Sequence, residues 1–494
     1  MSTAKKFAGQ TAIYGLSTVA SRMLSFFLTS AYTRAYSKSI YGIFSNMFAN
    51  ASLIQALLAF GMETTFFRYL NKHENRKQQV YNNAFAATFV ISVIFLAITL
   101  PCINSIARWI SIEKNTSFHD YKLYTIYFIS FMVIDAWCVV PFAKVRANGR
   151  PMRYGFIKLV NVLVFIALNL VFIYVLPYII SHHSVGSAWV SSWFRQGWLG
   201  YIFLSNLVAS ALTLLLLLPE LLELGFKFNS SMFWQMLTYS LPVLVANLSF
   251  IINENLDKML LGKMLPENIS SSQLGIYAAC AKIAVFLNIF VQAFRLGAEP
   301  FFFSHAKNKN APQTYARIMN FFVIAVCVAF LGVVANIQIL KHFIGASYWV
   351  GLNVVPLLLF GYVSLGIYMN LSVWYKLSDQ TRYGLYISGV GAVLTITLNV
   401  VFIPRYSYMA SAWASLISYT VMMILSYVWG QKNYPIPYHI KKNIAYIFTS
   451  IVLVFLSFVV FKRNLLAGNA LLLVFALAAI YFERNELRII FRKR

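Results

Sequence analysis

Three basic residues of this 494-residue chain, Arg22, Lys282 and Arg295, fall inside long apolar stretches of sequence. A charged side chain within a bilayer is costly unless it pairs with another group, meets water or reaches an interface. Guanidinium and ammonium groups along a water-filled path attract phosphate and other anions. We therefore predict that these residues line a substrate cavity. The alternatives are a structural ion pair for Arg22 and side chains that reach the interface for Lys282 and Arg295.

Three acidic residues suggest ion coupling and gating. Asp135 lies deep in an apolar segment, which makes it the best single candidate to bind a coupling ion, either H+ or Na+. Glu63 and Glu299 lie at the inner ends of their segments, within two stretches of similar sequence. Either glutamate could form a gate by pairing with a basic residue of the opposite half of the chain. The alternative is that the interface simply hydrates these two helix ends.

Two further basic residues have acidic or apolar surroundings. Asp257 and Lys258 are adjacent in the sequence, so on a helix they point about 100° apart and we predict no direct pair between them. Glu254 precedes Lys258 by one helical turn, which predicts a pair between Glu254 and Lys258 and also leaves Asp257 and Lys258 as candidates for gating or ion coupling. Lys158 lies one turn inside its apolar segment, so we expect it to reach the interface.

The elements that carry these residues are membrane helices. Hydrophobic residues make up 60% of the chain and charged residues 11%, against about 25% charged in soluble domains. At about 20 residues for each crossing, the apolar stretches predict about fourteen helices. The segments are 8–33, 41–63, 81–106, 122–143, 154–177, 199–218, 234–261, 273–299, 317–340, 350–373, 383–403, 408–429, 443–461 and 465–482. This composition excludes soluble, disordered and disulfide-stapled classes.

The excess of positive charge, 40 Lys and Arg against 14 Asp and Glu, lies mostly in one set of alternating loops. Membrane proteins keep such loops on the cytoplasmic side, so the bias predicts that both chain ends are cytoplasmic. It accounts for the charge without nucleic acid. The four cysteines are scattered and form no Cys-X-X-Cys motif, so they suggest neither a metal site nor a redox site.

The two halves of the chain repeat at an offset of about 230 residues. Tyr41-Gly42-Ile43-Phe44 matches Leu274-Gly275-Ile276-Tyr277, and the seven residues from Gly61 match the seven from Gly297. The match predicts two parallel six-helix repeats in an all-α membrane protein. We expect a first repeat at 1–218, a linker at 219–233, a second repeat at 234–430, and two extra helices with a basic tail at 431–494.

Several short motifs in this order carry a family resemblance. They are Tyr41-Gly42, Ser240-Leu241-Pro242, Asp257-Lys258, Gly275-Ile276-Tyr277 and Pro300. With two groups of six helices and two extra helices, the chain resembles the multidrug/oligosaccharidyl-lipid/polysaccharide exporter superfamily. Within that superfamily it is similar to the polysaccharide-biosynthesis branch, the O-antigen repeat-unit flippases.

The resemblance implies two lobes around a central cavity in the bacterial cytoplasmic membrane. It implies alternating access, driven by an ion gradient, that moves a polyprenyl-pyrophosphate-linked oligosaccharide to the outer leaflet, where a polysaccharide polymerase and a chain-length regulator would act. It implies a transporter rather than an enzyme, with no cofactor besides the coupling ion. The sequence contains no Gly-X-X-X-X-Gly-Lys-Ser/Thr loop that would cradle ATP.

Three other functions stay open. Ser21-Arg22-Met23-Leu24-Ser25 is similar to the lipid II flippase branch, although Leu28 and Thr29 stand where that branch carries an Arg-Asp pair. A drug/cation antiporter of the same superfamily would share the fold, but it usually has an acidic cavity. A membrane-embedded polysaccharide polymerase or acyltransferase would typically need a large external loop or an embedded histidine, and neither is evident.

Overall fold

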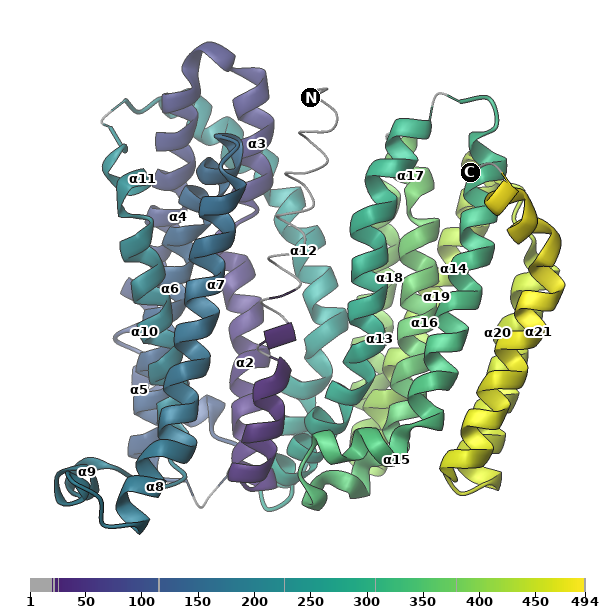
Figure 1. Cartoon of the computed structure of the whole chain (residues 1–494). Coiled ribbons are helices and arrows are strands. Elements are labelled where there is room, and N and C mark those ends of the chain that lie inside the picture. The colour runs from purple at the N-terminus through teal and green to yellow at the C-terminus, as the bar shows by residue number, and fades with distance from the viewer. Residues whose placement is uncertain are drawn as a thin grey trace. The chain divides into compact units, whose positions relative to one another are not determined.

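The computed structural model describes residues 20, 23, 24, 26–113, 116–225, 227–306, 308–378 and 380–492 (Figure 1). The described chain is helical and forms two compact units, Met1–Gly275 and Ile276–Arg494. Twelve helical segments of the described chain are long and apolar enough to cross a membrane, and Gly200–Leu216 is a shorter apolar helix. All the predicted segments from 41–63 onward coincide with one of these helices, whereas most of 8–33 lies outside the described residues.

The first unit is built from membrane helices joined by short helical turns, and the beginning of α13 belongs to it. Its elements are α2 (Lys38–Ala59), α3 (Met62–Lys72), η1 (Glu74–Arg76), α4 (Lys77–Thr99), α5 (Ile103–Ile110), α6 (Phe118–Ala147), α7 (Pro151–Leu170), η2 (Val171–Val175), α8 (Leu176–Ser181), α9 (Ser187–Trp193), α10 (Gly200–Leu216), α11 (Leu218–Leu222), α12 (Ser230–Met264) and α13 (Ser270–His305).

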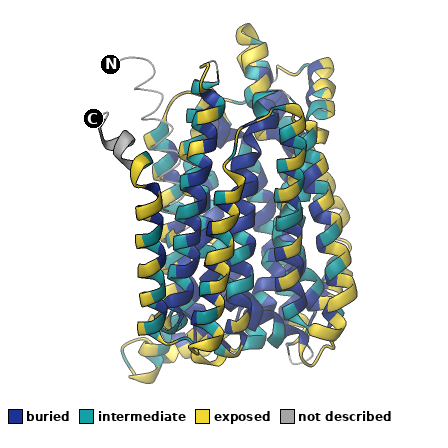
Figure 2. Cartoon of the chain, turned by 90° about the vertical axis from the view of Figure 1, so that its right-hand side faces the viewer, coloured by how far each residue is buried: buried dark blue, intermediate teal, exposed yellow. Residues whose placement is uncertain are grey.

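The second unit contains the rest of α13 and the C-terminal helices. Its further elements are α14 (Ala311–Ala335), α15 (Ile337–Leu340), η3 (Lys341–Phe343), η4 (Ala346–Val354), α16 (Val355–Leu371), α17 (Val373–Leu377), α18 (Arg382–Tyr406), α19 (Tyr408–Asn433), α20 (Ile440–Phe455), η5 (Leu456–Val460) and α21 (Leu465–Arg492). Exposed positions recur along α21 from Leu466 to Asn485 (Figure 2). Large apolar side chains such as Leu473 and Phe482 are exposed there, as expected for a surface that faces lipid.

Local sequence sets where the helices of the first unit begin and break. The Ser37 hydroxyl accepts a hydrogen bond from the Ile40 amide and caps the start of α2. Phe60 and Gly61 then take left-handed conformations, with φ of 47° and 65°, which ends α2 and redirects the chain into α3. The left-handed region strains most residues but not glycine, so Gly61 suits this break. A Cβ added to Gly61 would meet Val243 and Ser240 of α12. Pro242, which lies between these two residues, is therefore at the level of Gly61.

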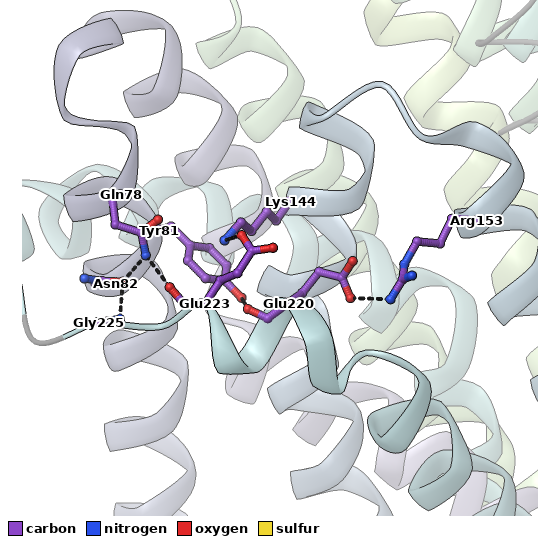
Figure 3. A network of polar contacts seen from close by, with 8 residues as sticks. All are labelled: Gln78, Tyr81, Asn82, Lys144, Arg153, Glu220, Glu223 and Gly225. Atoms are coloured by element: carbon purple, nitrogen blue, oxygen red, sulfur yellow. Dashed lines mark hydrogen bonds and ion pairs between the residues drawn. The ribbon is translucent and has the colours of Figure 1, made fainter.

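The segment between α10 and α12, predicted as a linker at 219–233, is bound to the first unit (Figure 3). Glu220 is 2% exposed and accepts a contact of 2.9 Å from Arg153 on α7, while the Tyr81 hydroxyl on α4 donates to the Glu220 carbonyl at 2.7 Å. Lys144 on α6 forms an ion pair with Glu223 at 2.6 Å. Its ammonium lies 3.8 Å from the centre of the Tyr81 ring. The connection is therefore part of this unit's packing.

The two compact units divide the chain at a different place from the predicted sequence repeats. By contacts, all of α12 packs with the first unit, and the division falls within α13. The predicted repeats divide the chain before α12, at 219–233. A repeat boundary records sequence similarity and a compact unit records packing, so the two need not coincide. The repeat boundaries stay a prediction.

Candidate functional site

A cavity of about 780 Å³ lies within the first unit among α2, α3, α6, α7, α10 and α12. This volume falls within the range of small-ligand pockets, roughly 300–1,000 Å³. Many of its walls are polar although all six helices belong to membrane-spanning or apolar segments. The polar side chains that line it are Ser52, Gln55, Glu63, Asp135, Arg146, Tyr154, Lys158, Asn161, Asn206, Ser210, Thr213 and Asn247.

Helical spacing puts these polar residues on one wall. On α7, Tyr154, Lys158 and Asn161 recur at positions i, i+4 and i+7, which lie on one face of a helix. On α10, Asn206, Ser210 and Thr213 repeat the same spacing. Each helix therefore turns a polar stripe to the cavity, while most of its other residues are apolar. Polar side chains in an otherwise apolar helix need polar groups or water beside them, so these stripes indicate a polar or hydrated space between the helices.

Hydrogen bonds between helices hold the stripes in place. The Gln55 amide on α2 donates to the Asp135 carboxylate on α6 over 3.1 Å. The Asn161 amide on α7 donates to the Ala209 carbonyl oxygen at 3.1 Å and to the Thr213 hydroxyl at 2.8 Å, both on α10. Because these bonds join different helices, they fix the shape of the wall.

Four charged side chains of the described residues line the cavity, two bases and two acids. Arg146 forms an ion pair with Glu63. Lys158 is close enough to Asp135 to interact with it electrostatically, and its ammonium lies 4.4 Å from the centre of the Phe142 ring. Among the described residues, the cavity therefore carries as many bases as acids.

Glu63 has a different partner from the one considered for a gate. Pairing with a basic residue of the opposite half and hydration at the interface were the two predicted possibilities, and the structure pairs Glu63 with Arg146 of the same unit. The left-handed residues Phe60 and Gly61 begin α3 just before Glu63, which brings its side chain to the C-terminal part of α6. The guanidinium of Arg146 also lies 4.9 Å from the centre of the Phe67 ring on α3. The partner of Glu63 is therefore set by the break between α2 and α3, which brings Glu63 close to Arg146, and not by the relation between the two repeats.

Asp257 and Lys258 correct one prediction. The ammonium of Lys258 lies 3.6 Å from the buried carboxylate of Asp257, so the neighbours do pair. The same ammonium donates to the backbone carbonyl of Glu254 at 3.0 Å and to the Asn255 side chain at 3.2 Å. The angle between the two Cβ directions was a poor guide, because the long lysine stem bends back to reach its neighbour.

The other predicted residues lie elsewhere. Arg22 and the side chain of Glu299 fall outside the described part of the structure. Lys282 and Arg295 both lie on the second unit's part of α13, separated along the axis by about 20 Å at 1.5 Å for each residue. Lys282 is half-buried, and Arg295 lines a pocket of about 10 Å³, which is close to the volume of one water probe. The second unit alone does not bring these two cations together.

Sequence reasoning missed part of the first unit's cavity. Lys158 was expected to reach the interface, yet it lines the cavity, and Arg146, Asn206 and Asn247 were not singled out. The recurrence of polar residues at i, i+4 and i+7 in two apolar segments was the available signal. Asp135, the predicted ion-coupling residue, lies in the same cavity, and its role stays a prediction.

Comparisons with known proteins agree with this architecture. A family model described as polysaccharide biosynthesis protein matches residues 7–303, more than half of the chain. No curated protein matches the sequence. A lipid II flippase, MurJ, in an inward closed conformation aligns with a TM-score of 0.72 and 13% identity, over 96% of this chain and 99% of that chain.

Two multidrug transporters have similar structures. An inward-facing MATE family transporter of the MOP superfamily aligns with a TM-score of 0.59 and 15% identity, over 85% of this chain and 94% of that chain. The Vibrio cholerae MATE transporter VcmN in its bent form gives 0.54 and 13%, over 90% and 98%. At these identities the likeness shows a shared fold.

Proposed function

Because the chain belongs to the polysaccharide biosynthesis protein family, we propose that it is a flippase for a lipid-linked oligosaccharide. Its cargo is an oligosaccharide repeat unit on polyprenyl pyrophosphate, as used for O-antigen and lipopolysaccharide, and its location is the bacterial cytoplasmic membrane. We place both chain ends in the cytoplasm, which puts α3 and the segment between α10 and α12 on the side where the cargo is made.

The observation that carries this proposal is the polar cavity within the membrane-spanning first unit. A polar group in hydrocarbon is costly unless it is hydrogen-bonded or hydrated, so helices that turn amides, hydroxyls and charges toward a shared space favour a polar cargo. Amide and hydroxyl side chains are suitable partners for the hydroxyl groups of a sugar. A volume of about 780 Å³ leaves room for several sugar rings.

The mechanism that we propose is alternating access between the two six-helix repeats. Arg22, Lys282 and Arg295 attract the pyrophosphate, while the polyprenyl tail stays in the lipid. Asp135 binds the coupling ion, H+ or Na+, in the first unit's cavity beside Gln55. No covalent chemistry is required, because the cargo leaves as it entered.

Gating is assigned to ion pairs at the helix ends. Glu63 with Arg146 lies at the cavity and would open toward the cytoplasm, and Asp257 with Lys258 would act toward the opposite end. Glu299 is the equivalent of Glu63 in the second repeat and is proposed for the same role. On the product side, a polysaccharide polymerase and a chain-length regulator would take up the flipped repeat unit.

Complementation tests this function in cells. The chain is expressed in a bacterial strain that lacks its own repeat-unit flippase but keeps its polymerase, and surface polymer is measured. We expect polymer to return. Restored peptidoglycan synthesis in a strain without a lipid II flippase, and no surface polymer, would instead assign the chain to lipid II. Resistance to cationic drugs alone would assign it to drug antiport.

A further inference from the structure

Among the described residues, the acids and bases that line the first unit's cavity are equal in number, and one acid and one base form an ion pair. Glu63 is held by Arg146, and Asp135 accepts a hydrogen bond from Gln55 and feels the charge of Lys158. Among the described residues, two acids and two bases line the cavity, so the described walls carry no surplus of either sign. A cargo that brought an extra charge would have to separate one of these pairs in a space with a low dielectric constant.

Two side-chain amides at this cavity make no hydrogen bond to the described part of the chain. Asn206 on α10 is half-buried and Asn247 on α12 is exposed, and both line the cavity. Each amide offers two N–H donors and one carbonyl acceptor, the combination that pairs with a sugar's adjacent hydroxyls. Phe250, also on α12, adds an apolar ring that can cover the less polar face of a sugar.

We propose that the first unit's cavity binds sugars without net charge: neutral sugars, or sugars whose acidic and basic substituents balance. The unpartnered amides of Asn206 and Asn247 receive the hydroxyl groups, and the binding of the sugar does not itself separate Glu63 from Arg146. This inference rests on the proposed function and narrows its cargo, since the predicted cationic cavity would instead favour acidic sugars. It concerns the sugar portion alone and leaves the pyrophosphate to other residues.

The balance of acids and bases also predicts how selectivity between neutral and acidic sugars can be changed. Glu63→Gln removes the acid from Arg146 and leaves a guanidinium at the cavity that a carboxylate can approach. The variant should therefore accept acidic sugars that the natural chain rejects. Asn206→Ala with Asn247→Ala removes the free hydrogen-bonding groups and should weaken sugars of either kind.

Binding of two soluble trisaccharides to the full chain in nanodiscs of zwitterionic lipid tests the proposal. Maltotriose is neutral and trigalacturonate carries three carboxylates, and the two have similar size. Saturation-transfer NMR and its titration give the affinities. We expect maltotriose to bind about tenfold more tightly or better, because an uncompensated buried charge is costly. The double Asn variant should lose most maltotriose binding, and Glu63→Gln should move the preference toward trigalacturonate.

Matched variants separate local effects from general damage. Asn308→Ala changes an exposed loop amide that has no side-chain hydrogen bond, and Glu74→Gln changes an exposed carboxyl outside the cavity. Both should bind as the natural chain does. Tighter binding of trigalacturonate by the natural chain, unchanged binding in the double Asn variant, or binding of neither trisaccharide would overturn the inference. If the natural chain flips lipid-linked oligosaccharide in the same membranes, the proposed function survives that failure.

Discussion

Gly42 on α2 and Gly275 on α13 lie in backbone contact within the first unit. A Cβ on Gly42 would stand 3.1 Å from the Gly275 amide nitrogen and 1.8 Å from the Ser271 carbonyl oxygen. A Cβ on Gly275 would stand 3.1 Å from the Gly42 nitrogen and 2.0 Å from the Lys38 carbonyl oxygen. These two glycines occupy matching positions in the two similar sequence stretches, so the predicted equivalents meet each other.

This contact predicts a strong packing effect. Gly42→Ala or Gly275→Ala should lower the free energy of unfolding by about 1–3 kcal/mol, because overpacking forces the helices apart. Thermal unfolding in detergent measures the loss. Gly389→Ala, on α18, is the control, since a Cβ there would meet nothing within 4 Å. Equal melting temperatures for Gly42→Ala and the control would show that α2 and α13 do not approach this closely.

A second prediction concerns the loop before α10. Arg195 donates two hydrogen bonds to the buried Asp120 carboxylate, at 2.8 and 3.0 Å, and Trp198 donates a third at 2.8 Å. These hydrogen bonds to Asp120 raise the pKa of Arg195. Arg195→Ala should cost about 1–3 kcal/mol, less than a fully buried pair because Arg195 is half-exposed.

The control for the hydrogen bonds between Arg195 and Asp120 is a substitution that keeps the positive charge but changes the geometry of the donor. Arg195→Lys should recover only part of the stability, because an ammonium cannot match the two parallel bonds of a guanidinium. Chemical or thermal unfolding in detergent reports both variants. A lysine variant as stable as the natural chain would mean that charge alone holds the loop.

The third prediction distinguishes two roles of Lys158. If it only reached the interface, Lys158→Met would leave transport intact. Because it lines the cavity beside Asp135, we expect transport to fall by about tenfold or more, since an acid then lies there without its base. Lys77→Met, at the exposed start of α4, is the matched control and should transport normally.

Asp135→Asn tests ion coupling. The amide keeps the shape of the side chain but cannot exchange a proton or hold Na+ through a charge. We expect the variant to bind the sugar and yet fail to respond when an ion gradient is imposed across proteoliposomes. A variant that still accelerates with the gradient would move the coupling site away from Asp135.

Arg22→Ala tests the predicted pyrophosphate contact. The variant should insert into the membrane at normal levels and lose polymer export, because the anionic part of the cargo would lose one of its three proposed cations. Membrane fractionation and surface polymer are measured together. Normal export from inserted protein would remove Arg22 from the mechanism.

The sequence predicts the helices well because each is a long apolar run bounded by charge. The sequence does not predict which side chains contact each other. The partner of Glu63 could not be predicted, because it depends on how the break at Phe60 and Gly61 turns α3 toward Arg146. Lys258 was misjudged because side-chain reach outweighs helical angle.

The position of Lys158 along its segment was also a poor guide to where its side chain lies. Its distance from the segment end suggested the interface, whereas its helical face decides that it lines the cavity. Charge balance was equally hidden, because each base and its acid come from different helices. Asp135 could be predicted as a candidate from its own position in an apolar segment. Its neighbours Gln55 and Lys158 could not be predicted, because they lie on other helices.

Translocation by the purified chain tests the central claim most directly. The full chain is reconstituted into vesicles with a fluorescent polyprenyl-pyrophosphate-linked oligosaccharide, and the fraction reaching the opposite leaflet is followed with a sugar-cleaving enzyme outside. We predict translocation that an imposed H+ or Na+ gradient accelerates and that protein-free vesicles lack. Vesicles that hold folded chain and move no lipid-linked oligosaccharide under either gradient would contradict the account.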